Sequence, residues 1–160
     1  MARRPPTTLQ LEQFLPYRLV SLAQGISTAL SAIYREEFGI SAAEWRVLAN
    51  LAEMGELNPK EVALQTAMDK AKVSRAIKEL SARRLVIKRR DDGDNRAYRL
   101  RLSDKGLVLY GKIVPLALSW EGRLLDALDA SEYRDLLRII DKLSRRIEAG
   151  VAIDDRGLSR

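Results

Sequence analysis

The spacing of apolar residues changes its period twice along this 160-residue chain, and this change constrains the fold more than any other feature. Steps of three and four residues, typical of amphipathic helices, extend from about residue 11 to residue 84. Residues 85–102 then alternate with a period of two around the turn Asp91–Asn95, which predicts a β-hairpin. Helical spacing returns after Ser103. The sequence therefore predicts a mainly α fold with one small hairpin.

Capping residues predict where the helices begin. The first helix should extend from Leu11 to about Glu37, with Pro16 either in its first turn or at a kink. A long helix should follow Ser103 and continue to about Leu128. The remaining helix starts are marked by residues that accept hydrogen bonds from free N–H groups: Ser41 with Glu44, Asn58 with Glu61, Asp69, and either Asp129 or Ser131.

The fourth helix, after Asp69, combines a packing face with a basic face. Val73, Ile77 and Leu80 fall on one side, whereas Arg75 and Lys78 fall near the opposite side. Two short helices, an outward-facing basic helix and a hairpin follow the order of a winged helix-turn-helix. Charge supports this interpretation, because residues 70–105 carry 13 lysines and arginines against five acidic residues, while the rest of the chain is net acidic.

The exposed residues of this segment are suited to DNA. Arginine and lysine can reach guanine edges or phosphates, and a planar guanidinium can enter a narrow minor groove. Asp94 is either a wing residue that orients Arg96 or an ordinary turn residue, and Ser74 either bonds a phosphate or its own backbone. The predicted DNA contacts are Lys70, Lys72, Ser74, Arg75, Lys78, Lys88, Arg89 and Arg96.

Two absences exclude most catalytic and metal chemistry. The chain contains no cysteine and no histidine, which removes disulfides, thiol nucleophiles, histidine bases and the common zinc sites. The enzyme alternative would use carboxylates such as Asp91, Asp92 and Asp94, but these lie in a polar turn where nothing apolar raises a pKa. Without a long apolar run or a secretion signal, we expect a cytoplasmic protein with no cofactor, no metal and no membrane partner.

Several segments together resemble the MarR family of transcriptional regulators. They are Ala67–Ile77, Leu85–Val86, Asp94–Arg96 and Leu102–Gly106. The resemblance implies one MarR-type domain over residues 1–160, with dimerisation helices at about 10–38 and 104–148 and a DNA-binding part at about 41–102. It implies a homodimer whose two winged heads bind a pseudo-palindromic double-stranded operator. The apolar stripes of the terminal helices independently favour a dimer.

The resemblance also implies a small-molecule effector. Residues 14–18 and 44–46 are similar to the branch that senses hydroxycinnamates or their coenzyme A thioesters, and Tyr17, Arg18, Trp45 and Arg46 would bind an anionic aromatic compound or its CoA ester. Simple core packing is the alternative for Trp45, and a solvated helix face is the alternative for Arg46. We therefore expect a ligand-responsive repressor of catabolic or efflux genes; the alternative is an architectural winged helix that binds nucleic acid without sequence preference.

Overall fold

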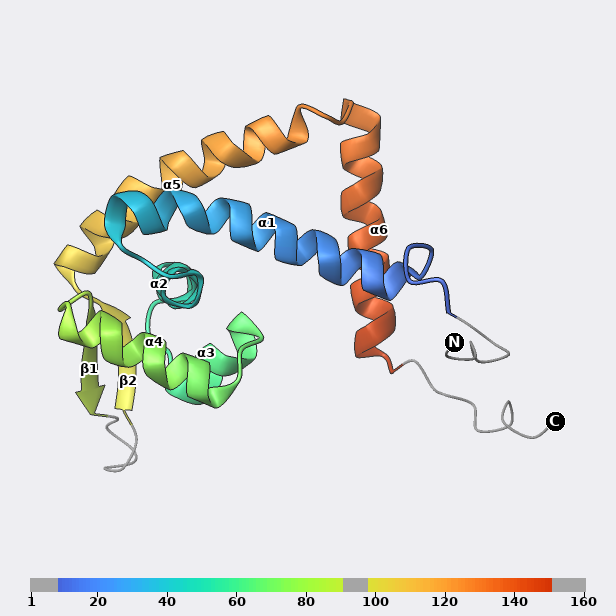
Figure 1. Ribbon diagram of the computed structural model, residues 1–160. Helices are drawn as coiled ribbons and strands as arrows, with labels where there is room; N and C mark the ends of the chain where they lie inside the picture. Colours follow the sequence, from blue (N-terminus) through green and yellow to red (C-terminus); the bar gives the residue numbers. More distant parts are fainter. Residues whose placement is uncertain (1–8, 91–97, 151–160) are drawn as a thin grey trace, which may run out of the picture. The chain divides into compact units, whose positions relative to one another are not determined.

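The computed structural model describes residues 9–90 and 98–150, and Figure 1 shows the elements in chain order. The chain divides into two compact units, Met1–Leu118 and Ser119–Arg160. The first unit holds α1 (Leu15–Phe38), α2 (Ala42–Met54), α3 (Pro59–Thr66), α4 (Lys70–Ala82), β1 (Val86–Arg90), β2 (Tyr98–Leu102) and most of α5 (Asp104–Leu125). The end of α5 and α6 (Ala130–Glu148) belong to the second. The predicted mainly α fold with one hairpin is confirmed.

Helix α1 begins at Leu15, four residues later than the predicted start at Leu11. Residues 11–13 form a turn instead, and Phe14 takes an extended backbone with φ −81° and ψ 107°. Pro16 lies in the first turn, where its missing N–H costs no hydrogen bond. The helix ends at Gly39, whose φ of 61° is the left-handed conformation that glycine adopts without strain.

Helices α2 and α3 start at the predicted capping boxes. The Ser41 N–H donates to the Glu44 carboxylate at 2.8 Å, and the Glu44 N–H donates to the Ser41 hydroxyl at 3.3 Å. Asn58 and Glu61 repeat this exchange at the start of α3, where Pro59 occupies the first turn. These local bonds satisfy N–H groups that a helix start would otherwise leave unpaired.

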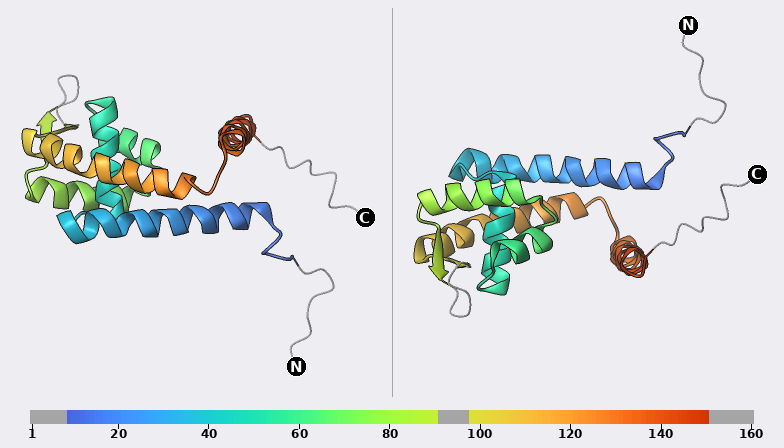
Figure 2. Two further views of the ribbon diagram at one scale, coloured as in Figure 1. Left: turned by 90° about the horizontal axis from the view of Figure 1, so that it is seen from above. Right: turned by 90° about the horizontal axis from the view of Figure 1, so that it is seen from below.

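Helix α4 also starts at its predicted cap, because the Asp69 carboxylate accepts a 2.8 Å bond from the Lys72 N–H. Figure 1 shows α2 end-on below α1, with α3 and α4 beside it, and α2 packs against all three of these helices. The views from above and below show the same helices around α2 (Figure 2). The helix-turn-helix is therefore built on α2.

The hairpin pairs β1 and β2 in antiparallel register, with Val86 opposite Leu102 and Arg90 opposite Tyr98. Its first strand begins at Val86, one residue after the predicted Leu85. A further pairing was not predicted from the sequence: Leu57 exchanges two backbone hydrogen bonds, of 3.1 and 2.8 Å, with Leu100. This bridge attaches the base of the hairpin to the connection between α2 and α3.

The predicted caps of the last two helices are confirmed. The Ser103 hydroxyl accepts from the Gly106 N–H at 3.0 Å, and Asp129 forms a capping box with Glu132. Helix α5 ends at Leu125, three residues before the predicted Leu128, and contains Pro115. Gly106 is required at its position, because a Cβ there would collide with the carbonyl oxygen of Leu85. The first turn of α5 therefore lies directly against the start of the hairpin.

The hydrophobic core lies in the first unit and joins α2, α3, α4 and the hairpin. Helix α6 contributes no buried residue to it. The buried apolar residues come from every element of the helix-turn-helix, from the end of α1 and from the middle of α5, and they are Tyr34, Ile40, Val47, Leu48, Leu51, Leu57, Val62, Val73, Ala76, Ile77, Leu80, Leu85, Val86, Leu100, Leu102 and Ile113.

Candidate nucleic-acid interface

Helix α4 separates packing residues from exposed residues as predicted. Val73, Ile77 and Leu80 are 0–2% exposed and hold the helix against the core. The opposite side carries Arg75 and Lys78, with Lys72 and Ser74 on its two flanks and Lys70 at the first residue of the helix, and all five of these predicted DNA contacts are exposed. The structure therefore brings Arg75 and Lys78 together on one face, while Lys72 lies on the side of α4 toward α2 and Lys70 and Ser74 lie on the side toward α3.

The connection between α3 and α4 is short and fixed by local bonds. Ala67 has a left-handed backbone with φ 51°, and the Met68 N–H donates to Ala63 O at 3.2 Å. The Thr66 hydroxyl donates to Val62 O at 2.6 Å and so is satisfied inside its own helix. The turn therefore sets the direction in which α4 leaves α3.

The basic residues of this region fall into two groups. Lys72 pairs with Asp69 at 3.3 Å, Arg89 pairs with Glu56 at 3.9 Å, and the Lys88 ammonium lies over the Tyr98 ring at 5.1 Å from its centroid. By contrast, Lys70, Arg75 and Lys78 make no ion pair within the described residues. Ser74 likewise makes no side-chain hydrogen bond there, so its hydroxyl is not bound to its own helix.

The cap of α4 has an electrostatic consequence. The pKa of Asp69 lies below its ordinary value, mainly because its carboxylate accepts a hydrogen bond from the Lys72 backbone, with a smaller contribution from the Lys72 ammonium. The carboxylate is therefore charged at neutral pH. A negative charge at this end stabilises the helix through its dipole, while the lysine ammonium offsets the charge near the basic surface.

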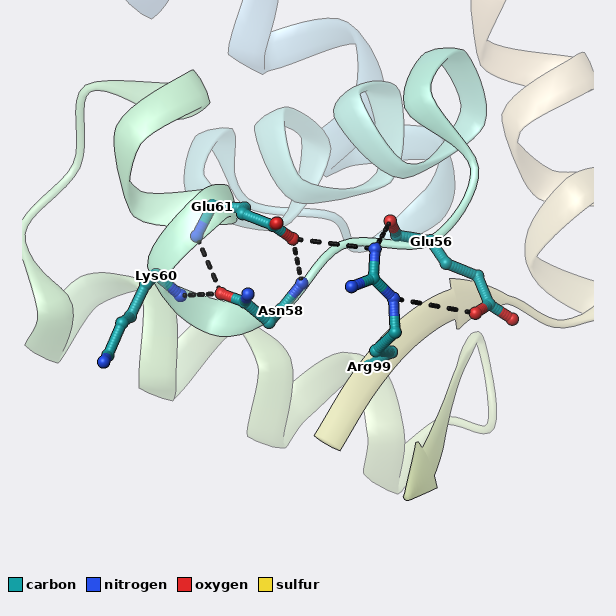
Figure 3. Close-up of polar contacts among 5 residues, drawn as sticks. All are labelled: Glu56, Asn58, Lys60, Glu61 and Arg99. Carbon is teal, nitrogen blue, oxygen red and sulfur yellow. Dashed lines mark hydrogen bonds and ion pairs between the residues drawn. The ribbon is translucent and has the colours of Figure 1, made fainter. Parts of the chain in front are cut away.

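Arg99 of β2 connects the hairpin to the start of the helix-turn-helix (Figure 3). Its guanidinium donates to Glu56 O at 2.8 Å and lies 3.8 Å from the carboxylates of both Glu56 and Glu61. The Glu61 carboxylate also caps α3 by accepting from the Asn58 N–H at 2.7 Å. Arg99 is therefore half-buried against these acceptors, and it fixes the hairpin against α3.

Two shallow hollows flank α4. One, of ≈ 280 Å³, lies against the start of α2 and is lined in part by Lys72, Arg75 and Glu79. The other, of ≈ 250 Å³, lies toward α3 and β2 and is lined in part by Lys70 and Ser74. The exposed side of α4 thus stands out from the surface between two depressions, as a helix that enters a groove must.

The predicted effector residues fall into two separate places within one chain. Tyr17 and Arg18 are exposed in the first turns of α1, whereas Trp45 and Arg46 lie in α2 beside the other end of α1. At 1.5 Å per residue, the length of α1 puts these places about 25 Å apart. One chain therefore does not bring the four residues together.

Trp45 lies at the centre of an aromatic stack that the sequence did not predict. Its ring stacks on Tyr34 of α1, with centroids 5.6 Å apart, and on Tyr110 of α5, with centroids 5.7 Å apart. Burial raises the pKa of Tyr34, while the charges of Arg46 and Arg35 act in the opposite direction. Trp45 thus packs against the core where three helices meet.

Sequence reasoning missed the inward role of Arg99 and its partners. In the sequence, Arg99 alternates with apolar residues as an outward residue of a hairpin would. The carbonyl that it binds, Glu56 O, lies 43 residues earlier, so no local pattern identifies it. Asp94 and Arg96, the predicted wing residues, lie outside the described residues.

A tight helix-turn-helix with a basic second helix, followed by a hairpin, defines a winged helix-turn-helix protein of the DNA-binding class. A sequence profile of the MarR family matches residues 38–97, a range that includes α2, α3, α4 and β1. The winged helix-turn-helix segment of the chain is thus similar to the MarR family of transcriptional regulators. This fold and family are those of regulators rather than of enzymes.

Two curated relatives support this assignment. The chain is 29% identical over 124 residues to the uncharacterised HTH-type transcriptional regulator YdgJ of Bacillus subtilis, covering 78% of this chain and 76% of that protein. It is 28% identical over 78 residues to the HTH-type transcriptional regulator BilQ of Clostridioides difficile, covering 49% of this chain. The chain spans about half of BilQ, 53% of its length.

Solved structures show the same fold. A MarR/EmrR family regulator from Acinetobacter matches with a TM-score of 0.79 at 24% identity, covering 88% of this chain and 99% of that one. BpsR of Bordetella bronchiseptica, whose DNA binding is regulated by 6-hydroxynicotinic acid, matches with a TM-score of 0.68 at 25% identity. The match covers 79% of this chain and 98% of BpsR. A variant of Escherichia coli MarR bound to operator DNA matches with a TM-score of 0.75 at 20% identity. The match covers 86% of this chain and 99% of that one.

In residues 9–90 and 98–150, no helix combines the length and the apolar character needed to cross a bilayer.

Proposed function

We propose that this regulator is a homodimeric repressor that binds a pseudo-palindromic operator sequence-specifically. One observation carries the proposal: α4 buries Val73, Ile77 and Leu80 and presents Arg75 and Lys78 with no partner of their own in the described residues. Placing two such side chains into a major groove breaks no existing ion pair. Arg75 would read a guanine edge, while Lys70, Lys72, Ser74 and Lys78 would bind base edges or phosphates.

The hairpin would supply the remaining DNA contacts. Lys88 and Arg89 are exposed on β1 and would bind phosphates. To do so, Lys88 must first separate from the Tyr98 ring and Arg89 from the Glu56 carboxylate. Arg96 would enter the minor groove with Asp94 orienting it. Because the contacts of β1 replace existing ones, we expect the hairpin to contribute less affinity per charge than α4.

Two apolar surfaces support the homodimer. Helix α6 has no buried residue, and its apolar side chains recur at three- and four-residue steps. The start of α1 exposes a second set. Such stripes on opposite ends of the chain are covered when two copies associate symmetrically. The exposed apolar residues are Leu11, Phe14, Leu15, Tyr17, Leu19, Val20 and Leu22 near α1, and Tyr133, Leu136, Leu137, Ile139, Ile140, Leu143 and Ile147 on α6.

The effector would be a small aromatic acid or its CoA thioester. BpsR, a relative by fold and sequence, responds to an aromatic acid, which favours the same class here. Because Tyr17 and Arg18 lie far along α1 from Trp45 and Arg46, a pocket that uses all four would combine residues from two subunits. Guanidinium groups and aromatic rings suit a carboxylate on a ring.

Operator selection tests the DNA-binding proposal. Duplexes selected from a random library should contain an inverted repeat, and Arg75→Ala should weaken binding to this operator more than to unrelated DNA, by about 1–3 kcal/mol. Lys88→Ala is the control and should weaken both about equally. Equal binding to selected and unrelated DNA would contradict the repressor and favour the architectural alternative.

A titration tests the effector. Hydroxycinnamates, benzoates and their CoA esters are added to the protein–operator complex, and release is followed by fluorescence anisotropy. Arg46→Ala should keep operator affinity and lose the response, whereas Lys142→Ala on α6 should respond like the parent. Failure of every compound to release DNA would contradict the assigned effector class.

A further inference from the structure

Arg83 connects the end of α4 to the end of α1. It follows the last residue of α4, and its guanidinium donates to two backbone carbonyls at the end of α1. The bond from Nη1 to Gly39 O and the bond from Nη2 to Phe38 O are both 2.8 Å long. Gly39 and Phe38 lie 44 and 45 positions before Arg83 in the sequence, so this contact is made by the fold and not by a local turn.

The chemistry of this contact is specific to arginine. The last carbonyls of a helix have no partner inside it and form the negative end of its dipole. A planar guanidinium presents parallel N–H groups that can bind two such oxygens at once, which a lysine ammonium cannot do in the same geometry. The contact therefore fixes both the position and the direction of the side chain.

The same point of the chain is also attached to α5. Lys105, in the first turn of α5, donates from its ammonium to Arg83 O at 3.1 Å. The Ser103 hydroxyl donates to Arg84 O at 2.7 Å. The end of α4 is thus bonded to both helices that lead away from the helix-turn-helix. Apart from the Arg83 bonds, α1 is connected to α4 through α2, which packs against both helices.

We propose that Arg83 is a positioning residue that sets the direction of α4 relative to α1, and thereby the spacing between the two DNA-reading helices of the dimer. This inference rests on the proposed homodimeric function. Helix α4 is about 20 Å long, so a tilt of about 10° at the Arg83 end moves its other end by about 3.5 Å. That displacement is close to the rise of about 3.4 Å per base pair. Loss of the Arg83 contact would therefore widen the range of half-site spacings that the dimer binds.

Spin-label distances in the dimer test the proposal without DNA. Because the chain contains no cysteine, Ser74→Cys introduces a single label site per subunit, on the exposed side of α4 and away from Arg83. The parent dimer should give one narrow distance distribution, which Arg83→Met should broaden. Arg84→Met is the matched control, since it removes the same charge from the next residue, whose side chain makes no polar contact within the described residues. Arg83→Lys keeps the charge and should still broaden the distribution.

A second readout uses the selected operator with one base pair added or removed between its half-sites. Arg83→Met should reduce the preference for the correct spacing by about tenfold, whereas Arg84→Met should keep it. An unchanged distance width together with unchanged spacing preference in both Arg83 variants would overturn the positioning role alone. A parent protein that gives no intersubunit distance would overturn the proposed dimer and this inference with it.

Discussion

Arg84 has a left-handed backbone with φ 58°, although it carries a side chain. A Cβ makes this conformation costly, and the residue persists in it because the chain must turn from α4 into β1. We expect Arg84→Gly to stabilise the protein by about 0.5–1 kcal/mol, after the greater freedom of glycine in the unfolded chain is taken into account. Urea denaturation measures the change. Arg84→Ala removes the same side chain but keeps the Cβ, so equal stability of the two variants would contradict the explanation.

Tyr34 links the stability of the head to alkaline pH. Burial raises the pKa of Tyr34 above the ordinary value of 10.0, against the smaller effects of Arg46 and Arg35. Its contribution to stability is therefore complete below pH 10, where both the folded and the unfolded chain hold the phenol proton. It is lost as the pH rises from there through the folded pKa, because the unfolded chain ionises first.

The measurement is the free energy of unfolding at intervals between about pH 9 and pH 11. Tyr34→Phe should make the alkaline decline less steep, since the variant has no proton to lose at this position. Tyr17→Phe, which alters an exposed tyrosine of the same helix, should retain the decline of the parent. An equally steep decline in Tyr34→Phe would show that burial does not shift this tyrosine.

At the scale of the elements, local and distant interactions differ in how far the sequence predicts them. Ser41, Asn58, Asp69 and Asp129 accept hydrogen bonds from residues two or three positions on, so their residue types alone indicate the helix starts. The backbone carbonyls that Arg99 and Arg83 bind lie 43–45 residues away. For this reason, the charge count of the segment predicts a basic surface correctly but does not separate its inward arginines from its outward ones.

Arg99 provides the prediction that belongs to this scale. Arg99→Met and Glu56→Gln should each destabilise the protein, and a double-mutant cycle should give a coupling of about 0.5–1 kcal/mol, because both side chains are about one-third exposed. Arg101→Met, an exposed arginine of the same strand, is the control and should show no coupling to Glu56→Gln. Additive effects of Arg99→Met and Glu56→Gln would contradict a fixed connection between hairpin and α3.

For the whole molecule, the hydrophobic pattern predicts apolar stripes on the terminal helices, but only the structure shows that they stay exposed. Leu136 and Ile140 are 39% and 47% exposed, on a helix with no buried residue. A chain that left so much apolar surface in water would lose much of the free energy that burial supplies. The surface therefore favours association, and the identity of the second chain stays a prediction.

Leu136→Glu tests this association. A buried leucine is worth about 1.5–3 kcal/mol, and a symmetric dimer loses it twice, so the variant should weaken dimerisation by about 3–6 kcal/mol. Sedimentation at micromolar concentration should then show a monomer, and the thermal midpoint should lose the rise with protein concentration expected of the parent. Lys142→Glu changes the charge by more than Leu136→Glu does, but Lys142 lies on the polar side of α6. The Lys142→Glu variant should therefore remain dimeric. If Leu136→Glu sediments as a dimer as stable as that of Lys142→Glu, then the apolar face of α6 is not the dimer interface, and the arrangement of the two heads must be set by α1 instead.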